Sequence, residues 1–106
     1  MKLYGLGTCD TCRKAIRELS PFDPEFQDVR KTPLSRPQID ALLEIFGDEL
    51  VNRKSTTWRG LSDTEKAMTA GDLLVAYPTL MKRPVIEHDG RHHLGWGAAT
   101  QAALLR

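Results

Sequence analysis

The hydrophobic pattern at the start of the chain predicts a strand, a helix and a second strand. Residues 1–6 contain a short apolar run punctuated by glycines, which is typical of a strand that enters a tight loop. The following helix is expected to run to about Leu19, with an apolar row at the spacing i, i+3, i+4, i+7 formed by Cys12, Ala15, Ile16 and Leu19. Ser20-Pro21 ends this helix, and residues 26–29 are expected to form the second strand.

The middle of the chain predicts helices with N-terminal caps. Ser35 and Gln38 form a capping box before an apolar row that Gly47 closes. Ser62 and Glu65 form a second capping box, which should open a short helix that runs to about residue 70.

The segments around that second helix are less regular. Residues 51–59 are polar and basic and have no helical period, so we expect a loop in which Trp58 is an aromatic anchor. Gly71 should interrupt the helix that begins after Ser62, and a further short apolar face should end at Pro78.

The last part of the chain predicts a β-hairpin and a final helix. Pro84 cannot donate to a sheet ladder, so it should be the first residue of a strand. Asp89-Gly90 is a strong signal for a two-residue hairpin turn, after which residues 91–94 should return antiparallel. Residues 98–105 are rich in alanine and leucine and should form a helix that covers one face of the sheet.

This order of elements predicts an α/β protein. A βαβ unit and a β-hairpin with a final helix together form a thioredoxin-like fold, with a mixed sheet of about four strands and an inserted helical segment. The length of 106 residues predicts a single domain that spans residues 1–106.

Composition and charge exclude several classes of partner. The formal net charge is +1, and no run of lysine and arginine forms a nucleic-acid patch, so direct binding of nucleic acid is not expected. No apolar stretch approaches the length of a membrane span, and the N-terminus has no signal-peptide pattern. We therefore expect a cytoplasmic protein without membrane contact.

Both cysteines lie in one short motif, Gly7-Thr8-Cys9-Asp10-Thr11-Cys12-Arg13-Lys14, at the start of the first helix. Cys9 should lie where free backbone N–H groups and the helix dipole favour an anion, and Arg13 and Lys14 could both lower its thiol pKa further. Cys12 begins the apolar row that faces the core. We therefore interpret Cys9 as an attacking thiol and Cys12 as its partly buried resolving partner.

Two alternatives compete with this interpretation. A structural disulfide would close so small a loop that its entropic gain is minor. Half a zinc site would need His88 and His92, but these residues straddle the Asp89-Gly90 turn, and no second Cys-x-x-Cys is present. We expect no metal site.

Three motifs together resemble the arsenate reductase/Spx family, and in particular its small YffB-like members, described as glutathione-dependent thiol reductases. They are the cysteine motif, the loop at residues 52–59 and the run Tyr77-Pro78-Thr79-Leu80-Met81-Lys82-Arg83-Pro84-Val85. The resemblance implies that Cys9 is the nucleophile, that Arg83 helps to hold an oxyanion, and that the peptide bond before Pro84 is cis.

Two further arginines of the arsenate site are missing. One position falls at Asn52 and the other near Gly95 or Trp96. Losing both would remove much of the charge complementarity for arsenate.

The expected function is thiol-disulfide oxidoreduction, in which Cys9 forms a mixed disulfide that Cys12 or glutathione resolves. Substrate binding is expected from Thr8, Thr11, Arg13, Lys54 and Pro84, with a threonine capping the helix and hydrogen-bonding the sulfur. We expect no bound cofactor, glutathione as co-substrate, a small thiol or oxidised thiol as substrate, and glutaredoxin or thioredoxin as partners. The alternatives are an Spx-like redox-sensing regulator that binds RNA polymerase, and an arsenate reductase.

Overall fold

A four-stranded mixed sheet is built from residues near both ends of the chain. In the computed structural model, which describes residues 1–105, the strands are β1 (Lys2–Gly5), β2 (Glu25–Asp28), β3 (Val85–His88) and β4 (Arg91–Leu94). Their order is β2-β1-β3-β4, with β1 parallel to β2 and antiparallel to β3, and β3 antiparallel to β4. The predicted mixed sheet of a βαβ unit and a hairpin is therefore confirmed.

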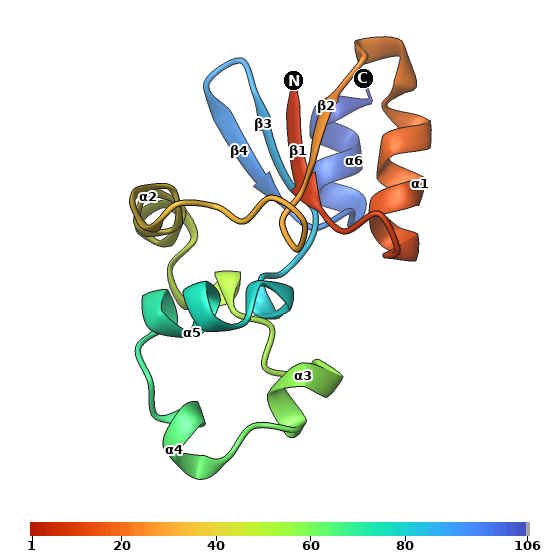
Figure 1. Cartoon of the computed structure of the whole chain (residues 1–106). Coiled ribbons are helices and arrows are strands. Elements are labelled where there is room, and N and C mark those ends of the chain that lie inside the picture. Colours follow the sequence, from red (N-terminus) through yellow and green to blue (C-terminus); the bar gives the residue numbers. More distant parts are fainter. Residues whose placement is uncertain (106) are drawn as a thin grey trace. The chain divides into compact units, whose positions relative to one another are not determined.

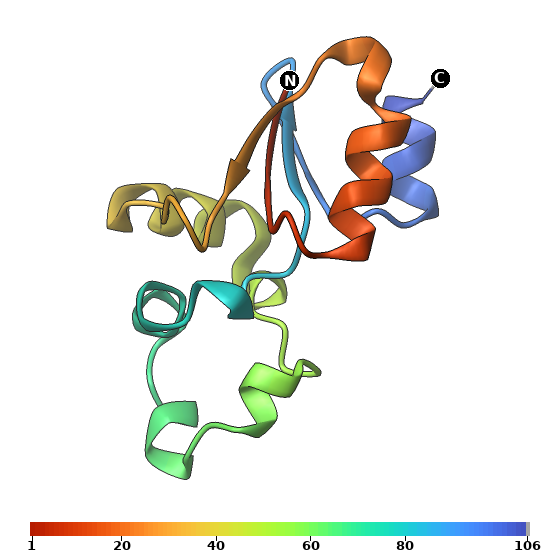
Figure 2. The same ribbon diagram turned by 45° about the vertical axis from the view of Figure 1, so that its right-hand side comes forward.

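Two helices cover one face of this sheet. α1 (Asp10–Glu18) and α6 (Ala98–Leu104) lie side by side in both views (Figure 1, Figure 2). The short 3-10 turn η1 (Ser20–Phe22) follows α1 and leads into β2. The buried core between sheet and helices is formed by Leu3, Ala15, Leu19, Ile86, Trp96 and Leu104. The indole Nε1 of Trp96 donates a hydrogen bond of 2.7 Å to Glu18, which ties the start of α6 to α1.

The β3–β4 hairpin has the turn that the Asp-Gly signal predicts. His88 pairs with Arg91, so Asp89 and Gly90 are the two turn residues. Both have positive φ angles, 51° and 74°. This backbone matches the right-handed twist of the strands, and aspartate and glycine tolerate it best.

Residues Arg30–Lys82 form a second compact unit. The residues before and after this range form the first unit, which contains the sheet. Its helices are α2 (Arg36–Phe46), η2 (Gly47–Leu50), α3 (Thr56–Arg59), α4 (Asp63–Lys66), α5 (Ala70–Ala76) and η3 (Pro78–Leu80). This unit is the inserted helical segment that the sequence predicts. That both units form a single domain over residues 1–106 stays a prediction.

Local caps determine where the helices of this unit begin. The capping boxes of Ser35 with Gln38 and of Ser62 with Glu65 are both present, so these predictions are confirmed. The expectation of a loop over residues 51–59 is wrong in part, because the Ser55 hydroxyl accepts from the Trp58 N–H and starts the four-residue helix α3.

The predicted helix boundaries around Gly71 are also wrong. The helix that follows Ser62 ends at Lys66, and the Thr69 side chain caps a new helix, α5, which contains Gly71. The guanidinium of Arg36 lies over Gly71, and it also contacts Asp72 at 2.7 Å. A glycine in α5 therefore has a packing role between α2 and α5 and does not interrupt the helix.

No helix within residues 1–105 is long and apolar enough to cross a membrane.

Leu3 tests the sheet-helix core. It is fully buried on β1, so Leu3→Ala should lower the free energy of unfolding by about 2–5 kcal/mol in urea unfolding followed by circular dichroism. Leu105→Ala removes the same atoms from a side chain that is 43% exposed, and it should change stability by less than about 0.5 kcal/mol. Equal losses in the two variants would contradict this account of the core.

Candidate redox-active site

The loop between β1 and α1 places the two cysteines. Cys9 is the N-cap residue of α1, with extended backbone angles, and its N–H donates to the Leu6 carbonyl at 3.1 Å. Cys12 lies one turn further along α1 and is fully buried, whereas Cys9 is half-buried. Both are free thiols. A substrate in solution can therefore reach the Cys9 sulfur but not the Cys12 sulfur.

Gly7 fixes this loop through both of its backbone groups. The Gly7 N–H donates to the Asp28 carboxylate at the end of β2 (3.0 Å), and the Gly7 carbonyl accepts from Arg13 Nε on α1 (2.8 Å). We call these two hydrogen bonds the Gly7 clamp. It joins a strand end and a helix to the loop, and so holds Cys9 at the start of α1.

Gly5 makes room for the second cysteine. A Cβ at this position would overlap the Cys12 sulfur and would lie 3.6 Å from the Phe26 ring. The missing side chain therefore lets the Cys12 thiol pack directly on β1.

Hydrogen bonds to the Cys9 sulfur favour its thiolate. Burial raises the pKa of the Cys9 thiol, but the Cys12 backbone N–H, the Arg83 side chain and the Cys12 thiol donate to the sulfur, and the positive charge of Arg83 adds to their effect. The net result is a pKa below the ordinary value of a cysteine. The N-terminus of α1 is a favourable place for this negative charge.

The pKa of the Cys12 thiol shifts in the opposite direction. Burial is the largest cause, and it raises the pKa of Cys12. A hydrogen bond from the Leu6 backbone N–H lowers this pKa, whereas the charge of the Cys9 thiolate and the hydrogen bond to Cys9 raise it. The net result is a pKa of about 11 for Cys12. The pair therefore consists of a half-buried, more acidic thiol and a buried, less acidic one. These directions agree with the interpretation of Cys9 as the attacking thiol, whose role stays a prediction.

Arg83 and Pro84 approach the cysteines from the strand side. The bond between them is cis, as the family resemblance implies, and Pro84 is buried immediately before β3. The Pro84 carbonyl accepts from the Gly95 N–H at 2.8 Å. Arg83 is thus held at the start of β3, where its side chain hydrogen-bonds the Cys9 sulfur.

The other predicted substrate-binding residues have different places. The expectation of a threonine cap is wrong, because Cys9 occupies the N-cap of α1 without a side-chain cap, and both Thr8 and Thr11 are exposed. Arg13 belongs to the Gly7 clamp and is not among the groups that lower the pKa of Cys9. Lys54 lies in the second unit, beside a hollow with Arg53, and its part in substrate binding stays a prediction.

The histidines of the hairpin do not form a metal site. His88 lies 3.4 Å from Asp89 and His92 lies 3.4 Å from Glu87, on separate strands. Within residues 1–105, no group of three or more His, Cys, Asp or Glu side chains could hold a metal ion.

Comparison with known proteins identifies the family. The model of the ArsC family matches residues 4–104. This chain belongs to the ArsC family. An uncharacterized protein of Haemophilus influenzae is 38% identical to this ArsC-family chain over 101 residues, which cover 89% of each protein. The global transcriptional regulator Spx of Streptococcus pyogenes serotype M6 is 29% identical over 106 residues, which cover 92% of this chain and 79% of Spx.

Solved structures show the same fold. A protein named YFFB is 32% identical, with a TM-score of 0.88 and coverage of 99% of this chain and 98% of that one. An arsenate reductase (ArsC) related protein from Brucella melitensis is 31% identical, with a TM-score of 0.74 and coverage of 99% and 93%. The predicted thioredoxin-like α/β fold and the predicted family are therefore confirmed.

Sequence reasoning missed two residues of this ArsC-family site, Gly5 and Asp28. The carboxyl ends of the parallel strands β1 and β2 meet at one edge of the sheet, since Gly5 pairs with Asp28. The signal in the sequence is an aspartate near the end of the second strand. A carboxylate at that position can accept from the free backbone N–H groups of the glycine-rich loop that follows the first strand.

The Gly7 clamp predicts a measurable effect on Cys9. In Asp28→Ala the loop should loosen, so the pKa of Cys9 should rise toward its ordinary value and iodoacetamide should alkylate Cys9 several-fold more slowly at pH 7, but not at pH 10. Asp28→Asn keeps an acceptor oxygen and should retain most of the parent rate. Glu25→Ala, an exposed change on the same strand, is the control. An unchanged ratio of the two rates in Asp28→Ala would show that the clamp does not position Cys9.

Proposed function

We propose that this ArsC-family protein is a thiol-disulfide oxidoreductase that uses Cys9 as its nucleophile. The observation that carries the proposal is the asymmetry of the cysteine pair. Cys9 is reachable and has a lowered pKa, while the pKa of the buried Cys12 is about 11. The more acidic thiol of the pair is therefore the one that a substrate can reach, and the less acidic thiol is buried.

The first step is attack of the Cys9 thiolate on the disulfide of an oxidised thiol. A bond forms between the Cys9 sulfur and one substrate sulfur, the substrate disulfide breaks, and the second substrate sulfur leaves as a thiolate. Arg83 stabilises the attacking thiolate before this step. After the step the Cys9 sulfur has lost its charge, and the guanidinium can hydrogen-bond a carboxylate of the bound thiol.

The second step resolves the mixed disulfide in one of two ways. Cys12 can lose its proton and attack the Cys9 sulfur, which releases the bound thiol and leaves a Cys9–Cys12 disulfide that an external dithiol reduces. Where the substrate is a mixed disulfide of glutathione and another thiol, that other thiol leaves in the first step and Cys9 keeps the glutathione. Reduced glutathione can then attack the sulfur of this bound glutathione, which forms oxidised glutathione and restores the Cys9 thiolate. Formation of the mixed disulfide removes the Cys9 charge that raises the pKa of Cys12, so the first step itself favours the Cys12 route.

The co-substrate and the partners follow from this chemistry. Glutathione supplies the thiol and a carboxylate that Arg83 can bind, and glutaredoxin or thioredoxin can reduce a Cys9–Cys12 disulfide. Neither the attack of Cys9 nor the resolution of the mixed disulfide needs a bound cofactor. Two free, titratable thiols suit a reducing compartment, so we propose a cytoplasmic location.

Two other functions remain candidates. Relatives named as the regulator Spx match along almost the whole of this chain, which favours a redox-sensing regulator as the second candidate. Binding of the isolated C-terminal domain of the RNA polymerase α subunit, with an affinity that changes on oxidation of the cysteines, would support the regulator over the reductase. Arsenate reduction is the third candidate. It is weakened because one of the two further arginine positions of the family's arsenate site falls at Asn52 and the other near Gly95 or Trp96.

Oxidised glutathione tests the proposed reductase directly. Mass spectrometry should find a stable glutathione adduct on Cys9 in Cys12→Ser, no adduct in Cys9→Ser, and a Cys9–Cys12 disulfide with little adduct in the parent protein. The reason is that only the parent has both a thiolate that attacks and a second sulfur that resolves. An adduct on Cys12, or a Cys9 that does not react, would contradict the assigned roles.

A further inference from the structure

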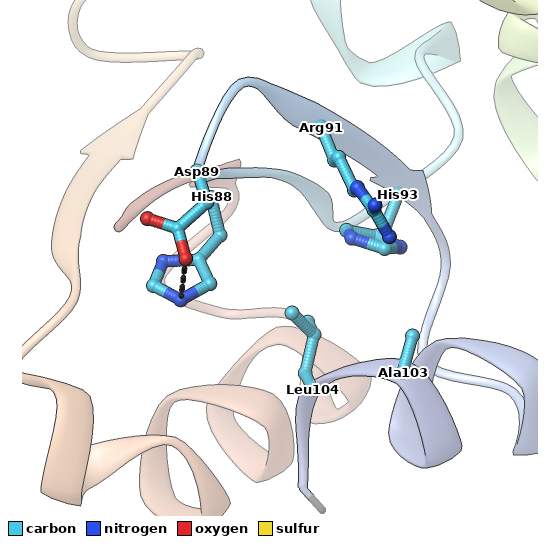
Figure 3. Close-up of a pocket in the computed structure, with 6 residues that line it drawn as sticks. All are labelled: His88, Asp89, Arg91, His93, Ala103 and Leu104. Carbon is cyan, nitrogen blue, oxygen red and sulfur yellow. Dashed lines mark ion pairs between the residues drawn. The ribbon is translucent and has the colours of Figure 1, made fainter.

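A hollow lies at the β3–β4 hairpin, against the last turn of α6. It has a volume of about 290 Å³ and is lined by His88, Asp89, Arg91, His93, Ala103 and Leu104. Figure 3 shows the Arg91 and His93 side chains next to each other, with the apolar Ala103 and Leu104 of α6 across the hollow. The cysteine chemistry does not use these polar groups.

The register of the hairpin explains why the polar groups converge. Arg91 and His93 are two positions apart on β4, so their side chains point to the same face of the sheet. His88 is directly opposite Arg91 on β3 and points to that face as well. His92 points to the other face, where it lies 3.4 Å from Glu87.

Basic side chains surround His93. Burial lowers the pKa of His93, and the neighbouring Arg91, His88 and His92 lower it further. The carboxylate in the lining is Asp89, which lies 3.4 Å from His88 and has an 87% exposed side chain. Figure 3 shows this carboxylate beside the His88 ring, away from Arg91 and His93. The α6 side chains in the lining, Ala103 and Leu104, are uncharged.

We propose that this hollow binds the phosphate group of a small soluble phosphomonoester, with Arg91 and His93 as its ligands. The guanidinium offers a planar fork of donors that matches two phosphate oxygens, and the imidazole offers a further N–H donor. Ala103 and Leu104 would contact an apolar part of the ligand next to the phosphate. The hollow has room for such a ligand but not for a folded partner.

The site is independent of the proposed redox function. Cys9 follows the carboxyl end of β1, whereas the hairpin turn lies beyond the opposite end of β1, where Lys2 pairs with Glu87. A failure of the hollow to bind phosphate would therefore leave the Cys9 chemistry unaffected, and the reverse also holds.

Proton linkage gives the proposal a quantitative signature. A bound phosphate near His93 favours the imidazolium, so it should raise the pKa of His93. A tenfold preference of phosphate for the protonated form corresponds to a rise of about one pKa unit. His92, on the other face of the sheet, should shift much less. The comparison of these two histidines in one protein separates a local site from a general salt effect.

The experiment is a titration of the full chain with inorganic phosphate and with phenyl phosphate, followed through the C2–H resonances of the three histidines. We expect saturable shifts of His93 and His88, a dissociation constant below about 1 mM, tighter binding of phenyl phosphate because of the α6 contact, and a raised pKa of His93. Arg91→Gln should weaken binding at least tenfold. Arg17→Gln removes the same charge from an exposed position on α1. It should leave the dissociation constant within about twofold of the parent value, because Arg17 does not line the hollow.

Two results would overturn the proposal. One is a linear, unsaturated drift of all three histidine resonances with phosphate concentration, which is the behaviour of an ionic-strength effect. The other is equal weakening by Arg91→Gln and Arg17→Gln, which would show that net charge and not this hollow determines the response.

Discussion

The structure of the site depends on the hydrogen bonds that converge on the Cys9 sulfur at the first turn of α1. The backbone N–H of Cys12 and the guanidinium of Arg83 reach that sulfur from different elements, one from the helix and one from the start of β3. Neither donor is placed correctly unless the helix begins directly after Cys9 and the strand begins directly after Pro84. The sheet and the helix boundary are therefore requirements of the thiol chemistry as well as of the fold.

The rest of the sheet unit keeps this geometry. The Gly7 clamp connects the loop to β2 and α1, and the absent side chain of Gly5 lets Cys12 pack against β1. Burial then separates the two thiols chemically, since it opposes the Cys12 thiolate more than the partly exposed Cys9 thiolate. One short motif thus yields two cysteines of different acidity because they lie at different depths in the same turn of helix.

The sequence predicts what local signals determine. Capping boxes, the Asp-Gly turn and the apolar rows gave the strands, the main helices and the order of the elements, because each depends on neighbouring residues. The contacts that join distant segments were not predictable in this way. Gly71 was expected to break a helix, and only the Arg36 guanidinium above it explains why it lies within α5. The role of Asp28 likewise depends on the pairing of β1 with β2, and that of Arg83 came from the family resemblance.

The most direct test of this account is the titration of the Cys9 thiolate by its ultraviolet absorbance, in Cys12→Ser and in Cys12→Ser with Arg83→Gln. With Cys9 as the one remaining thiol, the account predicts a pKa below the value of about 8.5 for a free cysteine and a clear rise when the guanidinium is removed. The thiolate fraction at neutral pH would fall accordingly. A pKa at or above 8.5, unchanged by the loss of Arg83, would contradict the claim that the site is built to hold Cys9 as a thiolate.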